Sequence, residues 1–346
     1  VHSLGVLFNG VFSSPKHVSN VIIKSTPLIL TGLGVAFAFK TGLFNIGAEG
    51  QFIMGSVAAT VVGILFDFPP VIQIPLVLSA GVAAGAVYGG IAGFLKAKFG
   101  IHEVLTSIML NWIALYFSNY VCGLNRFHKP DTIGTYAINR SGYTMILGNY
   151  KATEEGKAAL AQNEFLRSTI LKTDVNAGFI IAIVLAVLIS FLLYKTAKGF
   201  ELRAVGSNRF AAEFSGIYVN RNILHSMLIS GAICGLAAAL YITGNSPHGI
   251  ATLAAFENTG FNGLAVCLIA ASSPIGCIFA GLLFGGLIYG GQTLQYEVGA
   301  PSEIINIVIG VIVFFVALTH IIPPLVERLR KVPLGKPGRN VSKGGK

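Results

Sequence analysis

Three polar residues stand close together in an apolar part of the chain. The stretch TGLFNIGAEGQF, residues 41–52, carries Asn45, Glu49 and Gln51 between two apolar runs. A carboxylate and two amides so close together could exchange hydrogen bonds with a polar solute, or could satisfy the main chain of an interrupted helix. Since Asn45 and Glu49 are four residues apart, helical geometry places them on one face.

Glycines at positions 42, 47 and 50 favour a broken backbone around these residues. Irregular backbone at membrane depth occurs where it is buried in protein or lines a watery cavity. Glu49 therefore has three interpretations: it pins the break by accepting hydrogen bonds, it lines a solute pathway, or it lies unpaired at the membrane interface. For the stretch as a whole we expect a pathway for a polar solute.

Further polar residues inside apolar segments extend this candidate pathway. Most are amides, which hydrogen-bond without a net charge and so suit a neutral solute better than an ion. They are Asn111, Asn258, Asn262, Gln292, Glu303 and Asn306. Each one alone also fits a role in holding helices together. Four nearby aromatic residues could stack on a base or simply pack in the membrane, namely Phe44, Phe52, Trp112 and Phe261.

The composition is that of an integral membrane protein. Of 346 residues, 53% are hydrophobic and 11% are charged, and the mean hydropathy is +0.73. A spanning helix needs about 20 mostly apolar residues. Apolar stretches of roughly that kind occur at 26–40, 46–66, 71–95, 103–124, 177–194, 223–243, 259–291 and 302–322.

The stretch at 259–291 is too long for one span and is expected to break near Ser273 and Pro274. The prediction is an all-α polytopic fold with about nine transmembrane segments, since a barrel would show short alternating strands. Glycines 81, 85, 89 and 93 follow at four-residue steps and therefore line one helix face. Small residues at this spacing let helices pack closely in lipid.

The net charge of +10 is concentrated in two segments, the link at 195–222 and the tail at 323–346. Under the positive-inside rule both are cytoplasmic, so the charge reports topology and lipid contact rather than nucleic-acid binding. Counting from them puts 1–24 and 125–175 outside, with transmembrane helices at 25–124 and 176–322. An external start at Val1 leads us to expect a further helix upstream of this chain.

The two polar links each predict a short helix. In the external segment, Thr153 can cap a surface helix that begins with two glutamates, and this segment would serve as a lid or a docking face. In the cytoplasmic link, a helix over 207–217 would be capped by Ser207 or Asn208 and stopped by Gly216. Such a helix fits a groove on another protein, or lies on the membrane surface.

Motifs for catalysis and metal binding are missing from the sequence. It has no zinc-protease motif and no nucleophile elbow, and its four cysteines and seven histidines lack metal-type spacing. We therefore expect no enzyme, no metal and no catalytic residue. A secondary transporter or channel working alone is the alternative from another class, but it would leave the cytoplasmic helix without a purpose.

The stretch AVGSNRFAAEFSGI resembles the cytoplasmic coupling loop of ABC transporter permeases of the branched-chain amino acid, ribose and nucleoside family. TPLILTGLGVAFAFKTGLFNIGAEGQ, LTSIMLNWIALY, FNGLAVCLIAASSPIG and GAPSEIINIVIGVIVFFVA look like its nucleoside branch, in that order. The residues that match the coupling motif or lie at its variable positions are Gly206, Asn208, Arg209, Ala211, Ala212, Glu213, Gly216 and Ile217.

This resemblance implies a permease subunit that carries nucleosides by alternating access, with ribose-type sugars or riboflavin as alternatives. The implied partners are cytoplasmic ATP-binding subunits, a second permease, identical or paralogous, and an external substrate-binding lipoprotein. ATP and magnesium would bind in the partner ATPase, and this chain would hold no cofactor. The implied location is the bacterial cytoplasmic membrane, with the C-terminus inside.

Overall fold

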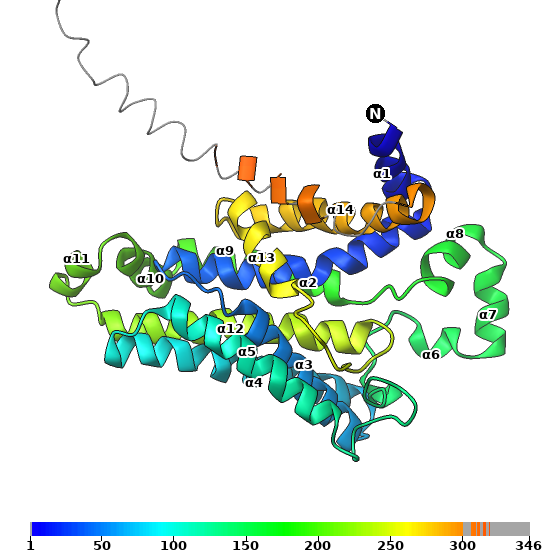
Figure 1. The fold of residues 1–346 in the computed structure, drawn as a ribbon, viewed down its shortest axis with the longest axis horizontal. Helices are drawn as coiled ribbons and strands as arrows, with labels where there is room; N and C mark the ends of the chain where they lie inside the picture. Colours follow the sequence, from blue (N-terminus) through cyan, green and yellow to red (C-terminus); the bar gives the residue numbers. More distant parts are fainter. Residues whose placement is uncertain (1, 300–305, 309, 312–313, 316–317, 319–346) are drawn as a thin grey trace, which may run out of the picture.

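The computed structural model describes residues 2–299, 306–308, 310–311, 314–315 and 318. Within this part the chain is a bundle of helices without a β-strand (Figure 1). In chain order the elements are α1 His2–Phe12, α2 Pro15–Lys40, α3 Ala48–Leu65, α4 Pro70–Phe99, α5 Glu103–Cys122, η1 Arg140–Gly142, α6 Gly148–Lys151, α7 Glu154–Ala161, α8 Glu164–Leu166, η2 Arg167–Leu171, α9 Gly178–Lys195, α10 Ala197–Ser207, α11 Arg209–Phe214, α12 Val219–Gly244, α13 Thr259–Ile269 and α14 Gly276–Val298.

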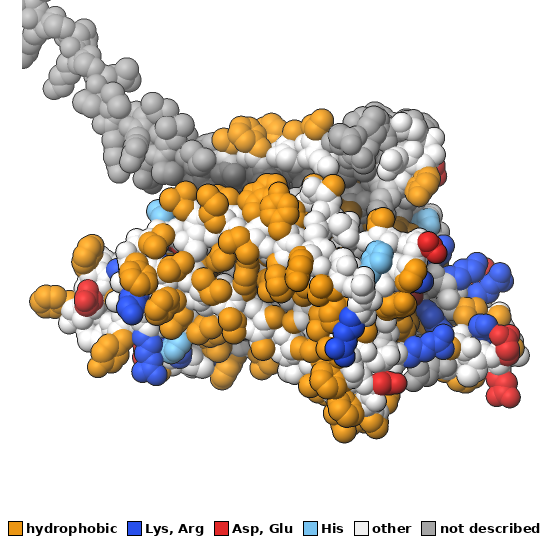
Figure 2. Space-filling model, turned by 60° about the horizontal axis from the view of Figure 1, so that its bottom comes forward, with side chains coloured by type: hydrophobic (Ala, Val, Ile, Leu, Met, Phe, Trp, Pro, Cys, Tyr) orange, Lys and Arg blue, Asp and Glu red, His pale blue; other side chains and the backbone are white. Residues whose placement is uncertain are grey.

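The predicted all-α membrane fold is confirmed. Seven helices, α2, α3, α4, α5, α9, α12 and α14, are long and apolar enough to cross a membrane, and α13 is a shorter apolar helix. The expected last span at 302–322 lies mostly outside the described residues, so the count of nine stays a prediction. Figure 2 shows hydrophobic side chains over the middle of the bundle and charged side chains at its two ends.

The predicted break in 259–291 is confirmed. Helix α13 ends at Ile269 and α14 begins at Gly276, and between them Ala271 and Ser272 have left-handed backbone at φ 49° and 55°. The start of α2 differs from the expectation of residue 26, because Pro15 occupies the first turn and a polar first half of the helix lowers the local hydropathy. Which side of the membrane residues 1–24 face stays a prediction.

The predicted glycine face of α4 packs against α12. A Cβ on Gly85 would lie 2.7 Å from the Cα of Gly235, and one on Gly93 would lie 2.7 Å from the Cβ of Met227. The two backbones thus approach too closely for larger side chains, as expected of helices packed in lipid.

The polar links lie at opposite ends of the bundle (Figure 1). One end, here the α11 end, carries α10 and α11; the other, the loop end, carries α6, α7 and α8. The predicted helix after Thr153 is confirmed as α7, whose first turn donates the Gly156 N–H to the Thr153 hydroxyl at 3.1 Å. The expected inside and outside faces of the membrane correspond to these ends, and that assignment stays a prediction.

Helix α13 begins beside the middle of α2. The chain leaves α12 at the loop end and runs back through residues 245–258, here called the return loop. At its end the carbonyl of Thr259 accepts a hydrogen bond from Thr31 Oγ1 at 3.3 Å, and Gly263 packs against Gly32. Because these contacts fall in the middle of α2, the first turn of α13 lies deep in the apolar region.

Candidate functional site

The buried carboxylate of Glu49 joins the starts of two helices. Glu49 lies in the first turn of α3 and has no exposed surface. Its Oε1 accepts the N–H of Asn258 at 3.0 Å, and its Oε2 accepts those of Gly260 at 2.6 Å and Phe261 at 3.3 Å. An anion at a helix N-terminus satisfies donors that have no partner within the helix. The interpretation that Glu49 accepts main-chain hydrogen bonds is therefore confirmed, but the backbone it pins belongs to α13.

Asn45 and Gln51 bind each other across the turn before α3. Asn45 Nδ2 donates to Gln51 Oε1 at 3.0 Å, and Gln51 Nε2 returns a hydrogen bond to Asn45 Oδ1 at 3.1 Å. Asn45 also donates to Ser230 Oγ at 2.8 Å and accepts the N–H of Gly47 at 3.0 Å. Both amides are buried, so they satisfy this turn and do not face a solute in this conformation.

Asn111 of α5 holds the same turn from the other side. Its Oδ1 accepts the N–H of Gly50 at 2.8 Å, and its Nδ2 donates to the carbonyl of Ile46 at 3.1 Å. At this break in the helix, the Gly50 N–H and the Ile46 carbonyl therefore both find a hydrogen-bond partner in the buried side chain of Asn111. Like the amide pair, Asn111 supports the turn and does not line the cavity described next.

A cavity of about 120 Å³ lies beside Glu49. It has room for several water molecules. Helices α3, α5 and α12 and the return loop form its walls. The lining residues are Glu49, Phe52, Ile53, Ser56, Ser118, Tyr241, Ile242, Asn245, Pro247, Gly249, Ile250, Ala251, Leu253 and Glu257. Of the predicted pathway residues, Glu49 is at this cavity, together with the stacking candidate Phe52. We call it the inner cavity.

The other predicted pathway residues are not brought to the inner cavity. Asn258 is exposed and takes left-handed backbone, φ 64°, at the start of α13. Asn262 is half-buried, and Gln292 and Asn306 are exposed. Glu303 lies outside the described residues. A polar residue between apolar neighbours in the sequence can lie on a helix face that lines a cavity or on one that faces lipid, and the sequence alone does not tell which.

The predicted aromatic residues fall into separate groups. Trp112 and Phe261 pack on Phe256 with ring centroids 4.7 and 5.7 Å apart, and this group borders the return loop. Phe44 packs edge-on against Phe39 at 4.9 Å, away from the inner cavity. Phe52 is buried in the cavity wall.

The sequence analysis missed Tyr241, whose ring lies 5.9 Å from that of Phe52. Tyr241 sits in an apolar span where nothing in its neighbourhood marks it, as does Phe256 at the end of a loop. Neither gives a local signal.

At the α11 end, the helix predicted over 207–217 is present as the shorter α11, Arg209–Phe214. Asn208 caps α11 by accepting the N–H of Ala211 at 3.1 Å, and Gly216 ends the segment with φ 80°. Ala212 is buried, Ile217 is half-buried, and Ala211 and Glu213 are exposed. Two aromatic residues that the sequence analysis did not single out, Phe210 and Phe214, are 85% and 99% exposed.

Contacts connect α11 with the turn before α3. Arg209 Nη2 donates to the carbonyl of Gly42 at 3.3 Å, and a Cβ on Gly206 would lie 2.9 Å from the Gly42 nitrogen. Gly42 itself has φ 73°, a conformation that favours glycine. On the preceding residue, Thr41 Oγ1 accepts a hydrogen bond from Ser226 Oγ at 2.9 Å. Contacts therefore tie α11 to the beginning of the turn that leads to Glu49.

Comparison with known proteins decides the family. Residues 17–317 match the family described as branched-chain amino acid transport system / permease component. The chain belongs to this family. The permease is therefore a membrane-spanning transport subunit of an ABC importer and not an enzyme, and ATP hydrolysis belongs to a separate subunit.

The permease is similar to several characterised relatives over nearly its whole length. It is 40% identical to the guanosine ABC transporter permease protein NupP of Bacillus subtilis, covering 94% of this chain and 88% of the relative. It is 35% identical to the nucleoside ABC transporter permease protein NupB of Lactococcus lactis, over 94% and 86%. It is 31% identical to the glucose ABC transporter permease protein TsgB13 of Haloferax volcanii, over 91% and 80%.

Proposed function

We propose that the permease carries nucleosides into the cell by ATP-driven alternating access. The observation that carries this proposal is the similarity to a guanosine permease at 40% identity over 94% of the chain. The weaker similarity to a glucose permease makes a sugar the second candidate. Secondary transport by the chain alone is disfavoured, because its family consists of subunits of larger transporters.

The chemistry of the inner cavity supports a nucleoside. The rings of Phe52 and Tyr241 offer faces on which a base can stack. The hydroxyls of Ser56 and Ser118 and the amide of Asn245 can exchange hydrogen bonds with a neutral solute. The two oxygens of Glu49 are engaged by α13 and hold the cavity floor in place. The solute would therefore meet mostly neutral groups.

The proposed coupling runs from α11 to the inner cavity. The exposed Phe210 and Phe214 would enter a groove on the cytoplasmic ATP-binding subunit, which makes the α11 end cytoplasmic. Movement of α11 would reach Gly42 through Arg209 and then pass to Glu49 through the turn between them. The hydrogen bonds of Glu49 with α13 would shift between two arrangements. ATP in the partner subunits and the binding protein with its bound solute would change the balance between these arrangements.

The remaining partners follow from the same proposal. A second permease, identical or paralogous, would complete the pathway, and a substrate-binding lipoprotein would dock at the loop end from outside. ATP and magnesium would bind in the ATPase subunits. The permease would lie in the bacterial cytoplasmic membrane with its basic C-terminal tail inside, where the tail meets lipid headgroups.

The proposal is tested by uptake into proteoliposomes that contain the permease with its ATPase, second permease and binding protein. Labelled guanosine and adenosine are offered with and without internal ATP, with ionophores present, and with ribose, glucose and riboflavin as competitors. ATP-dependent nucleoside uptake that persists with ionophores is expected. Uptake that follows an ion gradient without ATP, or ATP-driven uptake of a sugar or riboflavin alone, would overturn the proposal.

A further inference from the structure

A second cavity, of about 200 Å³, lies at the loop end of the bundle. It is larger and more polar than the inner cavity, and we call it the outer cavity. Its lining residues are Asn20, Ile23, Lys24, Lys172, Thr173, Asp174, Tyr241, Asn245 and Ser246. Tyr241 and Asn245 line both cavities, so the two lie on either side of these residues.

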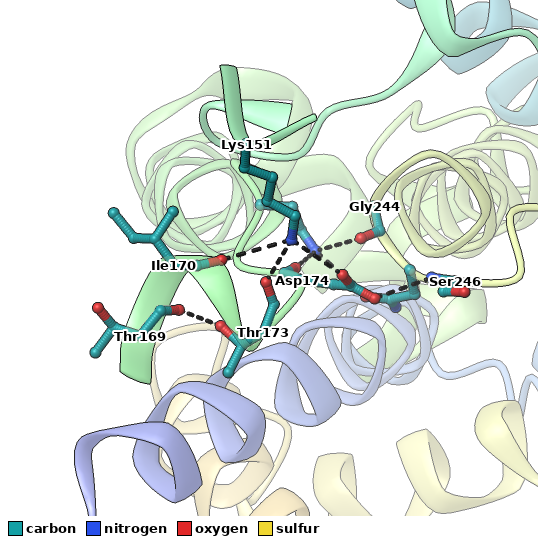
Figure 3. A network of polar contacts seen from close by, with 9 residues as sticks. Lys151, Thr169, Ile170, Thr173, Asp174, Gly244 and Ser246 are labelled. Carbon is teal, nitrogen blue, oxygen red and sulfur yellow. Dashed lines mark hydrogen bonds and ion pairs between the residues drawn. The ribbon is translucent and has the colours of Figure 1, made fainter. Parts of the chain in front are cut away.

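Hydrogen bonds fix the wall of the outer cavity that the loop supplies (Figure 3). Lys151 Nζ donates to the carbonyls of Thr173 at 2.8 Å and Ile170 at 3.5 Å, and lies 3.5 Å from Asp174 Oδ1. Asp174 Oδ2 in turn accepts the N–H of Ser246 at 3.3 Å. The polar groups of this wall are therefore held in place before any ligand arrives.

Asn245 is oriented by Asn176, which lies just before α9. Its Oδ1 accepts a hydrogen bond from Asn176 Nδ2 at 3.3 Å, and Asn176 also donates to the carbonyl of Gly244 at 3.3 Å. Within the described residues no partner is found for the Nδ2 group of Asn245, which leaves it as a donor at the boundary of the two cavities.

The outer cavity combines charged and neutral polar groups. The ammonium groups of Lys24 and Lys172 line it, and its one carboxylate, Asp174, lies 3.5 Å from Lys151 Nζ. An apolar ligand would desolvate the ammonium groups without replacing their hydrogen bonds. A neutral ligand that both donates and accepts hydrogen bonds fits this arrangement.

We propose that the outer cavity is an entry subsite for the sugar part of the solute, and that Tyr241 and Asn245 form the partition between it and the inner cavity. Neighbouring hydroxyls of a pentose ring accept hydrogen bonds from lysine and donate them to Asp174. The ring of Tyr241 then separates this subsite from the space beside Glu49. The inference rests on the proposed function, because it places the same solute one step earlier on its route.

The test measures protection of a cysteine in the outer cavity. The four native cysteines are buried, so Ser246→Cys adds one exposed thiol with almost no change in side-chain size. The assembled transporter is treated with a methanethiosulfonate reagent in the presence of guanosine, ribose or neither. Ala152→Cys, exposed between α6 and α7 at the same end of the bundle but outside the cavity, is the matched control.

Guanosine and ribose are expected to slow modification at position 246 and to leave position 152 unchanged. Lys172→Met should raise the ligand concentration needed for protection about tenfold, as expected for the loss of one charged hydrogen bond. Lys157→Met, outside the cavity, should leave that concentration unchanged. Equal modification with and without both ligands would overturn the inference, whatever solute the wild-type transporter takes up. The uptake assay on the wild type decides the proposed function separately.

Discussion

The Glu49 carboxylate accepts the N–H of Gly260 at 2.6 Å, across 211 residues of chain. This hydrogen bond links the first turns of α3 and α13 beside the inner cavity. The first N–H groups of a helix have no acceptor within that helix, and the Glu49 carboxylate supplies acceptors for those of α13. The pair therefore fixes how two interrupted helices lie relative to each other.

Glu49→Gln is expected to lower both stability and transport. The amide group places two donors where Asn258, Gly260 and Phe261 already donate, so at least one hydrogen bond to a charged acceptor, about 1.5 to 3 kcal/mol, is lost. Thermal unfolding in detergent and ATP-dependent uptake at equal expression measure the two effects. Glu49→Asp retains the charge and should recover part of both; a glutamine variant that matches the wild type would contradict this function of Glu49.

Asn111 and Asn262 are expected to differ sharply on substitution. Asn111→Ala leaves the Gly50 N–H and the Ile46 carbonyl unpaired in a buried place, at about 1 to 3 kcal/mol each. Asn262 is half-buried and its side chain makes no hydrogen bond within the described residues, so Asn262→Ala should stay close to the wild type. Thermal unfolding of both variants checks the difference. Equal losses would mean that the turn is not held by Asn111.

The sequence predicted the local features of the permease well. Helix caps, glycine steps and the breaks at 41–51 and near Ser273 depend on residues close together in the chain, and Thr153 and Asn208 cap as their types favour. The early start of α2 was missed because a polar first half obscures a helix when hydropathy is averaged over a window.

The arrangement of the candidate site was much less accessible from sequence. Glu49 finds its donors in α13 and Asn45 finds Ser230 in α12, both far away along the chain. Whether a buried amide faces a cavity or satisfies a neighbouring backbone depends on that pairing, which local spacing does not reveal. Tyr241 was missed for the same reason.

Adjacent glycines in α14 provide a matched test of helix packing. A Cβ on Gly285 would lie 2.9 Å from the Cβ of Ser25 in α2 and closer still to its hydroxyl, whereas one on Gly286 has Val21 as its nearest contact at 3.9 Å. Gly285→Ala should therefore reduce folded yield or thermal stability by about 1 to 3 kcal/mol, and Gly286→Ala should be neutral. The opposite order would show that α14 packs differently against α2.

Gly216 is expected to be sensitive for a conformational reason. Its φ of 80° favours glycine, yet a Cβ there would meet nothing within 4 Å. Gly216→Val should distort the end of the α11 segment and uncouple uptake from ATP turnover, while Gly216→Asn, which tolerates this conformation, should retain coupling. Uptake and ATPase activity are measured on the same preparation. Normal uptake by the valine variant would show that this turn does not transmit movement.

The permease is expected to lose stability in acid because His248 of the return loop is buried. His248 is buried against Tyr143, with ring centroids 3.9 Å apart, and burial lowers its pKa while the nearby Asp174 opposes the shift. The unfolded chain therefore binds a proton near pH 6.5 that the folded chain does not, so stability falls below that pH by up to about 1.4 kcal/mol per pH unit. Thermal unfolding at pH 7.5 and 5.5 should show a smaller pH effect in His248→Asn. An unchanged pH effect would exclude His248 as its source.

The most direct measurement concerns the inner cavity as the solute route. Ser118→Cys places a thiol in that cavity, where the native cysteines, all buried elsewhere, do not line the wall. The account predicts that a methanethiosulfonate reagent modifies it, that modification blocks ATP-dependent guanosine uptake, and that guanosine slows the reaction. Modification that leaves uptake intact and does not respond to guanosine would contradict a pathway beside Glu49.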